Sequence, residues 1–220
     1  MSGTEISGQA PTETSTGHTA TTAPDLRWRV CVLGATGTIG RATVAALVRQ
    51  GHDVVCLVRP QAGMQRGIEP TDRARPFEGA TLREVDITDK VSLVRDAFGG
   101  DAFDVIVSCM ASRTGVPKDA WAIDHRAHLN VLEAAKQSGV THFVLLSAIC
   151  VQKPLLAFQH AKLAFEAALI ESGLRYSIVR PTAFFKSLSG QIDRVRKGRP
   201  FLVFGDGTLT ACKPISDGDL

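Results

Sequence analysis

The sequence predicts a doubly wound α/β fold built around a parallel sheet. From Arg29 onward, short runs rich in β-branched residues alternate with longer amphipathic stretches, which is typical of repeated βαβ units joined by right-handed crossovers. The first of these runs leads directly into three closely spaced glycines. The chain has 220 residues, of which 44% are hydrophobic, so it can bury one core with helices on both faces of a sheet.

Six runs have the length and composition of buried parallel strands. They lie at residues 29–33, 54–58, 81–85, 105–108, 143–147 and 176–179. Five stretches between and after them repeat apolar residues with helical spacing. These predicted helices lie at residues 39–49, 91–98, 120–137, 156–171 and 184–195. A loop rich in Pro and Gly, at residues 60–79, follows the second strand in place of a helix.

The chain is predicted to have three parts. Residues 1–26 are rich in Thr, Ser, Ala and Gly and are expected to form a disordered tail. Residues 27–182 form the main domain. Residues 183–220 are expected to begin a small substrate-binding part that is incomplete here, with a strand at 201–204, a tight turn at 205–207 and the start of a helix at 216–220.

Composition excludes several classes of protein. The net charge is +3, the pI is about 8.7 and the basic residues are scattered, which argues against nucleic-acid binding. No apolar run approaches the roughly 18 residues of a membrane-spanning helix. Five cysteines occur singly, without a CxxC pair, and are expected to be buried free thiols rather than disulfides or metal ligands.

Three glycines at the end of the first strand predict a dinucleotide site. Gly34 allows a tight turn, Gly37 lets the backbone approach a pyrophosphate, and Gly40 lets the following helix pack closely. That helix presents free N–H groups and a positive dipole end to phosphates. The pattern, between a strand and a helix, is typical of the Rossmann fold. The cofactor-binding residues predicted here are Gly34, Thr36, Gly37, Thr38, Ile39, Gly40 and Arg41.

The end of the second strand indicates which dinucleotide binds. An acidic residue there would bind the ribose of NAD, but the position holds Arg59, while Asp53 lies at the opposite end of the strand. Arg59, helped by Arg41, offers a guanidinium to a 2′-phosphate, so the predicted cofactor is NADPH. A solvated arginine is the alternative. By their place in the fold, Asp86 and Ile87 are expected to meet the adenine, and residues 108–111, beginning with Ser108, the ribose.

The same motifs resemble those of the extended and atypical short-chain dehydrogenase/reductases. The resemblance covers Arg29 to the end of the chain. Longer runs, at residues 107–128, 142–166, 180–191 and 201–217, are similar to members that use NADPH to reduce one vinyl group of a divinyl chlorophyll precursor to ethyl. The resemblance therefore implies a magnesium tetrapyrrole as the small-molecule substrate; it implies no oligomeric state.

One position departs from the family pattern. Its members usually carry Tyr-x-x-x-Lys, in which the tyrosine transfers the proton and the lysine holds the ribose. This chain has Phe158 and Lys162, and its one tyrosine, Tyr176, is badly placed to substitute. Without a phenol, ordinary alcohol/ketone chemistry by that route is disfavoured, whereas reduction of a conjugated carbon–carbon double bond makes a different demand.

Two residues are predicted to be catalytic. Lys162 is expected to be a ribose ligand in the first place and a proton source in the second, with water or an unidentified residue as the other possible proton donors; a lysine on the wet face of an amphipathic helix is the alternative. Ser147 could hydrogen-bond the nicotinamide or the substrate, or it could cap a turn. Pro181 is expected beside the cofactor, and Phe184 with Phe185 would either stack on a flat ring or belong to the core.

Histidines are not expected to form a metal site. His160 is expected at the surface, and His125 and His128 lack a third ligand nearby. Two other functions stay open: a related reductase with a different substrate, or a non-catalytic NADP-sensing protein, which Phe158 favours. Because residues 1–26 lack Lys and Arg, unlike a transit peptide, we expect a bacterial cytoplasmic protein, or one peripheral to a photosynthetic membrane.

Overall fold

The computed structural model describes residues 27–60, 77–203, 206, 208 and 213–220. The predicted tail at 1–26, most of the loop at 60–79, most of the turn at 205–207 and Cys212 lie outside these residues. The division of the chain at residue 182 stays a prediction.

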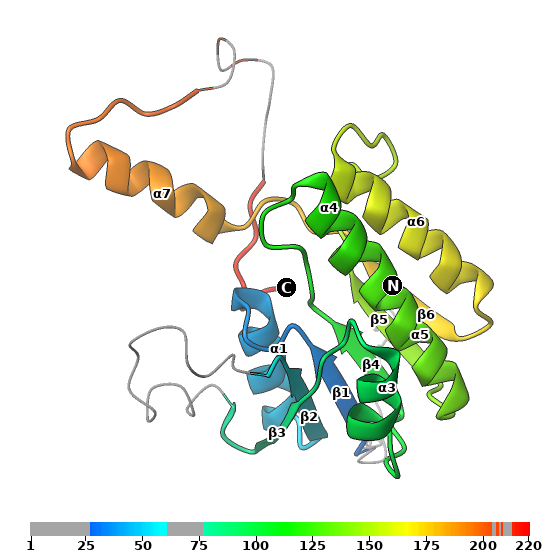
Figure 1. Ribbon diagram of the computed structural model, residues 1–220. Coiled ribbons are helices and arrows are strands. Elements are labelled where there is room, and N and C mark those ends of the chain that lie inside the picture. Colours follow the sequence, from blue (N-terminus) through cyan, green and yellow to red (C-terminus); the bar gives the residue numbers. More distant parts are fainter. Residues whose placement is uncertain (1–26, 61–76, 204–205, 207, 209–212) are drawn as a thin grey trace, which may run out of the picture.

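A single parallel sheet of six strands organises the molecule, in the order β3-β2-β1-β4-β5-β6 (Figure 1). The strands are β1 (Arg29–Leu33), β2 (Asp53–Val58), β3 (Ala80–Glu84), β4 (Val105–Ser108), β5 (His142–Leu146) and β6 (Arg175–Val179). Every boundary lies within one residue of its prediction. This order confirms the doubly wound Rossmann fold, with the direction of winding reversed between β1 and β4.

Both faces of the central strands β1, β2 and β4 are buried, because their alternate residues enter two separate cores, whereas the edge strands β3 and β6 are partly exposed. In β1, Val30 and Val32 pack into the core beneath helix α1 (Thr38–Arg49). Cys31 and Leu33 enter the larger core beneath α5 (His128–Gln137) and α6 (Ala157–Glu171). Figure 1 shows α1 on one side of the sheet and α5 with α6 on the other. Burial on both sides explains why the strands contain almost continuous apolar residues.

Two predicted helices contain π-helical segments. The helix predicted at 91–98 consists of α3 (Lys90–Ser92) and the π-helical η2 (Leu93–Ala97). The helix predicted at 120–137 begins at α4 (Pro117–Ala120), continues through the π-helical η3 (Trp121–Ala127) and ends with α5. Such segments widen the turn of a helix and are frequent at functional sites.

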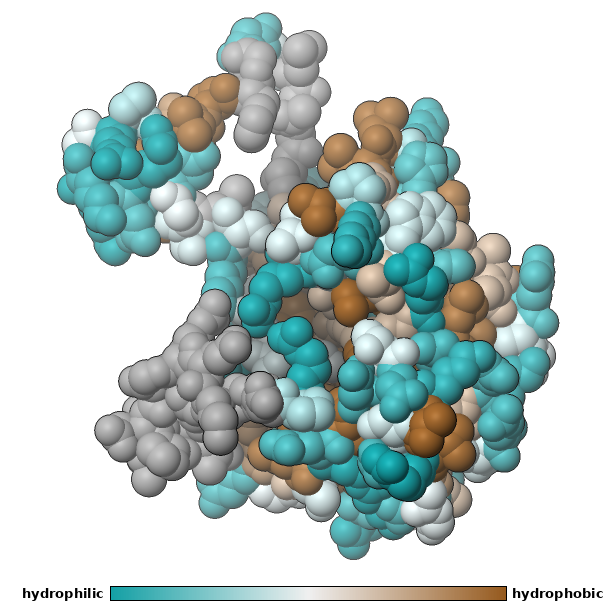
Figure 2. All heavy atoms as spheres, viewed as in Figure 1, coloured by the Kyte–Doolittle hydropathy of each residue, from teal (hydrophilic) through white to brown (hydrophobic). Residues whose placement is uncertain are grey.

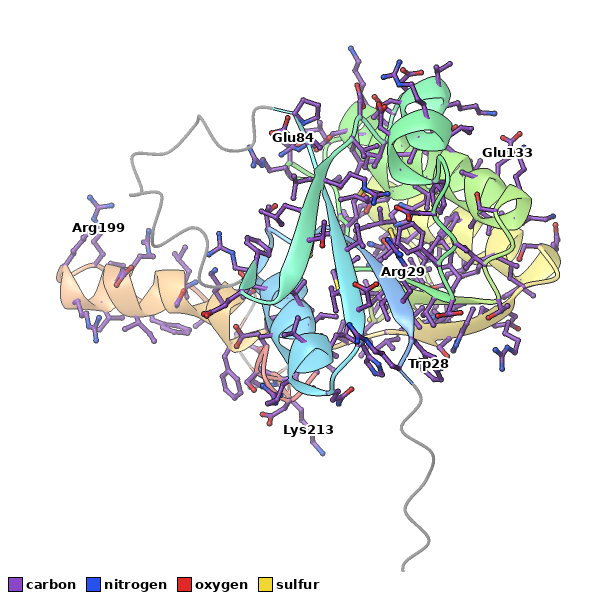
Figure 3. All side chains as sticks on the ribbon, turned by 90° about the horizontal axis from the view of Figure 1, so that it is seen from below. Trp28, Arg29, Glu84, Glu133, Arg199 and Lys213 are labelled. Atoms are coloured by element: carbon purple, nitrogen blue, oxygen red, sulfur yellow. The ribbon has the colours of Figure 1, made fainter. Side chains whose placement is uncertain are left out.

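The last helix, α7 (Phe185–Arg196), extends away from the rest of the molecule (Figure 1). A short parallel bridge between Phe184 and Ile215 anchors its first turn, and Thr182 Oγ1 donates a hydrogen bond to the Lys213 carbonyl at 2.6 Å. Figure 3 shows Lys213 near α1 and Arg199 at the far end of α7.

Two predictions for the end of the chain are wrong over the described residues. Residues 201–203 are exposed and irregular rather than a strand, because no neighbouring strand pairs with them there. Residues 217–219 form a turn instead of opening a helix, and Asp219 N–H donates to the Ser216 hydroxyl at 3.1 Å.

Candidate functional site

A cleft of about 320 Å³ opens at the carboxyl ends of β1, β2 and β4. It lies at the place where the strand order reverses, which is the usual ligand site of open α/β sheets. Figure 2 shows a hollow in the molecular surface with apolar residues inside it. The lining includes Leu33, Gly34, Gly37, Arg59, Ile87, Cys109, Met110, Arg113 and Asp119.

The glycine turn fits a dinucleotide. Gly34 has a φ of +71°, and a Cβ there would lie 2.7 Å from the backbone of Cys109 and Met110. A Cβ on Gly40 would lie 2.1 Å from the Gly34 carbonyl oxygen. Gly37 is the N-cap of α1, and no side chain caps this helix end. A residue larger than glycine at position 34 or 40 would therefore collide with the backbone of the turn. The first amides of α1 face the position where phosphates are expected.

Three basic side chains belong to the cleft or its rim. Arg59 is exposed and lines the cleft, and Arg113 lines it as well; the role of Arg59 toward a 2′-phosphate stays a prediction. Arg41 Nε donates to the Thr36 carbonyl at 3.2 Å, so this side chain holds the glycine loop. The Asp119 carboxylate accepts from the N–H groups of Arg113 and Thr114 and from the Thr114 hydroxyl. The two hydrogen bonds from Thr114, and to a smaller extent the charge of Arg59, lower the pKa of Asp119.

The predicted adenine and ribose residues occupy different surroundings. Ile87 lines the cleft. The Asp86 carboxylate accepts from Thr88 N–H at 2.9 Å, and hydrogen bonds from Thr88 lower its pKa. Ser108 is fully buried behind the cleft, where its hydroxyl lies 2.8 Å from His128 Nε2, so the structure does not bring this side chain to a ribose. Its neighbours Cys109 and Met110 line the cleft instead.

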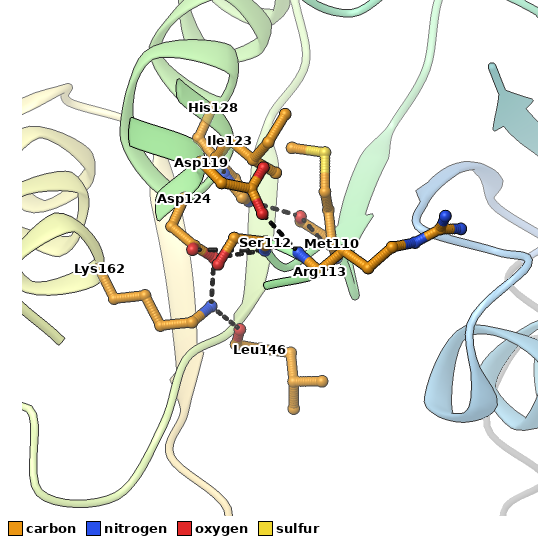
Figure 4. A network of polar contacts seen from close by, with 10 residues as sticks. Met110, Ser112, Arg113, Asp119, Ile123, Asp124, His128, Leu146 and Lys162 are labelled. Carbon is orange, nitrogen blue, oxygen red and sulfur yellow. Dashed lines mark hydrogen bonds and ion pairs between the residues drawn. The ribbon is translucent and has the colours of Figure 1, made fainter. Parts of the chain in front are cut away.

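Lys162 is buried and ion-paired, so the alternative of a lysine on a wet helix face is wrong. Its Nζ lies 3.2 Å from Asp124 Oδ1, and the exposed fractions of the two side chains are 7% and 0%. The same ammonium donates to the Leu146 carbonyl at 3.4 Å. Asp124 in turn accepts from Ser112 N–H, which ties the pair to the loop after β4 (Figure 4).

His128 is a neutral structural group in this network. Its Nδ1 lies 2.8 Å from the Ile123 carbonyl and its ring packs on Phe165, with centroids 4.7 Å apart. Burial, and then the positive charge of Lys162, lower its pKa to about 4. The described residues contain no group of three His, Cys, Asp or Glu side chains able to hold a metal ion.

Ser147 carries an unusual buried hydroxyl. Its Oγ is inaccessible and has no hydrogen-bond partner among the described residues, so it does not cap a turn. Its N–H donates to the Val179 carbonyl at 2.8 Å, and in the next loop Ile149 N–H donates to the Pro181 carbonyl at 3.0 Å. A buried hydroxyl without a partner is costly, and a bound ligand is one way to satisfy it.

Other candidates are spread around the site. Phe158 is half-buried on α6, His160 is exposed as expected, and Tyr176 is 44% exposed within β6. Phe185 is 57% exposed, so it does not belong to the core. Cys31 and Cys56 are buried free thiols whose pKa values are raised to about 12 by burial, but Cys150 is exposed, contrary to expectation.

Sequence reasoning missed three residues of the site: Asp124, Arg113 and Asp119. A carboxylate inside the apolar helical stretch at 120–127 was the available signal for Asp124, because an acidic side chain there must face either solvent or a buried partner. Arg113 and Asp119 lie in or next to a loop, where apolar periodicity carries no information about direction.

Plant reductases are similar to this chain. It is 49% identical, over 196 residues, to a protein of Oryza sativa subsp. indica named divinyl chlorophyllide a 8-vinyl-reductase, chloroplastic; the match covers 87% of this chain and 48% of that one. The protein of that name from Zea mays is 45% identical over 225 residues, with 100% and 56% covered. The chain thus spans about half the length of these relatives.

The predicted bacterial cytoplasmic location is contradicted by these relatives, because both are named as chloroplastic proteins of plants. That prediction depended on the composition of residues 1–26, which the structure does not describe. Within the described residues, no helix is both long and apolar enough to cross a bilayer.

The fold is shared with solved nucleotide-binding enzymes. The Bordetella bronchiseptica enzyme WbmG, in complex with NAD, superposes with a TM-score of 0.66 at 19% identity, covering 79% of this chain and 61% of that one. A family model described as NAD(P)H-binding matches residues 34–208, which begin at the first glycine of the turn. The chain therefore belongs to the NAD(P)H-binding family.

Proposed function

We propose that this chain contributes the cofactor-binding and catalytic part of an NADPH-dependent reductase that converts the 8-vinyl group of divinyl chlorophyllide to ethyl. The observation that carries the proposal is the buried Asp124–Lys162 pair, tied to the loop after β4 and to the end of β5, with phenylalanine at the family's tyrosine position. The names of the plant relatives support the substrate.

NADPH, rather than NADH, is the proposed hydride donor. The guanidinium of Arg59 lies at the end of β2, where the adenosine ribose is held in this fold, and no carboxylate follows directly. A planar guanidinium binds a phosphate by two parallel hydrogen bonds. Arg113 lines the same cleft and adds positive charge.

Reduction of a vinyl group to ethyl consumes one hydride and one proton. Bound NADPH supplies the hydride, and the protein or a water must supply the proton to the second carbon. Negative charge formed in between can spread into the conjugated macrocycle, so no alkoxide needs a strong acid beside it. Phe158 is compatible with this chemistry and not with ordinary ketone reduction.

Lys162 is the proposed ribose ligand and proton source. The Asp124 carboxylate lies against the ammonium, and the Leu146 carbonyl accepts a hydrogen bond from it, so both partners fix its direction. The Ser147 hydroxyl, one residue beyond Leu146, is the proposed partner for the nicotinamide amide or the substrate, because nothing in the described structure binds it. Pro181, in the loop after β6, would border the same end of the cofactor.

Absorbance spectroscopy tests the proposal. The chain is mixed with divinyl chlorophyllide and NADPH, and the Soret band is followed. A blue shift that requires NADPH, that Lys162→Ala slows strongly and that Lys197→Ala leaves unchanged supports an 8-vinyl reductase. Lys197 is an exposed lysine at the end of α7 and serves as the matched control.

A negative result separates the alternatives. If NADPH binds but the Soret band does not move, also when the experiment is repeated with a chain as long as the plant relatives, the assigned substrate is wrong. NADPH oxidation with another conjugated acceptor then identifies a different reductase. Tight NADPH binding without turnover of any acceptor indicates the non-catalytic sensing protein that Phe158 would also suit.

A further inference from the structure

Lys186, in the first turn of α7, reaches the glycine turn from the far end of the sequence. Its Nζ donates a hydrogen bond to Thr38 Oγ1 at 2.5 Å, across a separation of 148 residues. Thr38 is the first residue of α1, where a Rossmann fold holds the diphosphate of its cofactor. Because the Thr38 oxygen accepts from Lys186, its own hydroxyl hydrogen is available to a further acceptor.

Backbone hydrogen bonds anchor the first turn of α7, from which Lys186 extends. Phe185 N–H donates to the Ile215 carbonyl at 3.2 Å, and Ile215 N–H donates to the Ala183 carbonyl at 3.0 Å. These bonds hold the start of α7 against residues 213–215, while the rest of the helix extends into solvent (Figure 1). The backbone at Lys186 is thus held by residues 213–215, and the hydrogen bond to Thr38 joins its side chain to α1.

Electrostatics indicate that an anion belongs between these groups. The ammonium lies near the positive ends of two helix dipoles, α1 and its own α7. A cation is disfavoured at a helix N-terminus. Neither helix has an acidic residue in its first turn, and Lys186 forms no ion pair within the described part of the chain. A bound diphosphate would reverse this repulsion by placing negative charge against all three positive groups.

We infer that Lys186 is a ligand of the cofactor's diphosphate, supplied by the C-terminal segment to a diphosphate site otherwise formed by the glycine turn and the start of α1. The inference depends on the proposed dinucleotide function. It assigns different phosphates to different residues: Lys186 binds the diphosphate, common to NADH and NADPH, and Arg59 binds the 2′-phosphate of NADPH only. The hydrogen bond to Thr38 keeps the ammonium in place when no cofactor is bound.

Binding measurements distinguish these roles without any tetrapyrrole. Dissociation constants for NADPH and NADH are measured by nucleotide fluorescence on the whole chain and on three variants. Lys186→Met is expected to raise the dissociation constants of both nucleotides by the same factor, roughly tenfold, because each nucleotide loses one charge-assisted contact. Arg59→Ala is expected to raise the dissociation constant of NADPH and to leave that of NADH unchanged. Lys197→Met, at the other end of α7, is expected to bind like the parent chain.

Several results would overturn the inference. Unchanged affinities in Lys186→Met show that the lysine is only a surface residue. Weakening confined to NADPH assigns Lys186 to the 2′-phosphate instead. A loss shared by both nucleotides but accompanied by a lower melting temperature without ligand, and not rescued by Lys186→Arg, shows a folding effect. If the parent chain binds neither nucleotide, the proposed function itself has failed, whatever the variants do.

Discussion

Gly40 is constrained by the backbone of its own turn. A Cβ at this position would meet the Gly34 carbonyl oxygen at 2.1 Å, and backbone atoms cannot rotate away as a flexible side chain can. The helix could accommodate an alanine only by moving away from the turn. Since the first turn of α1 and Gly34 together form the proposed phosphate site, this movement would open it.

We therefore expect Gly40→Ala to reduce nucleotide affinity by at least tenfold and to destabilise the fold by about 1–3 kcal/mol, as overpacking in a close contact does. Gly190→Ala is the matched control, because nothing lies within 4 Å of a Cβ there and alanine favours the helix. Nucleotide titration and urea unfolding measure the two effects. Equal behaviour of the two variants would contradict the close packing.

Burial of His128 predicts a pH dependence of stability. Its pKa falls from an ordinary 6.5 to about 4 in the folded protein, so the unfolded chain binds more protons between these values. The free energy of unfolding should therefore decrease as the pH falls from about 6.5 to about 4, with a slope of up to about 1.4 kcal/mol per pH unit from this group.

His128→Gln isolates this contribution. The variant is expected to be less stable at pH 7, because the contacts with Ser108 and Ile123 are disturbed, but to lose less further stability between pH 7 and pH 5 than the parent chain. Urea unfolding at the two pH values measures the difference. The same loss in both proteins would mean that other groups cause the pH dependence.

Among the elements, η3 and α6 are joined by a buried charge pair. Asp124 and Lys162 are both removed from water, so each depends on the other for compensation. A buried pair of this kind adds little net stability compared with apolar residues, whereas removal of one partner leaves an uncompensated charge. The pair therefore fixes how the two helices meet more than it strengthens their contact.

A double-mutant cycle tests this coupling. Asp124→Asn and Lys162→Met are each expected to lower the free energy of unfolding by about 3–5 kcal/mol, and the double variant to lose clearly less than the sum. Urea unfolding provides the four values. Additive losses would show that the two charges do not depend on each other.

Elements could be predicted from the sequence where one physical signal dominates. The central strands were placed to within one residue because both of their faces are buried and β-branched residues crowd into them. The apolar run at 201–203 has the composition of a strand but no partner strand, and the strand predicted there was wrong. The Asp124–Lys162 contact joins segments far apart in the chain, which periodicity within a window cannot reveal.

At the scale of the whole molecule, the sheet gathers residues from five strand ends at one edge. Gly34 follows β1, Arg59 follows β2, Ile87 lies beyond β3, and Met110 and Ser147 follow β4 and β5. Parallel strands make this convergence unavoidable, so the cofactor edge could be predicted as soon as the strand order was. The contact of Lys186 with α1 could not be predicted, because nothing local in the sequence indicates where α7 lies relative to the sheet.

Cofactor binding should stabilise the whole fold, because a dinucleotide contacts residues from both halves of the sheet. At one hundred times its dissociation constant, a ligand adds about 2.7 kcal/mol, which raises the melting temperature of a chain of this size by roughly 5–10 °C. At equal concentration NADPH should raise it more than NADH. Arg59→Ala should remove that difference while keeping the NADH effect. Thermal denaturation followed by circular dichroism gives the values, and an equal effect of both nucleotides on the parent chain would exclude Arg59 as the residue that recognises the 2′-phosphate.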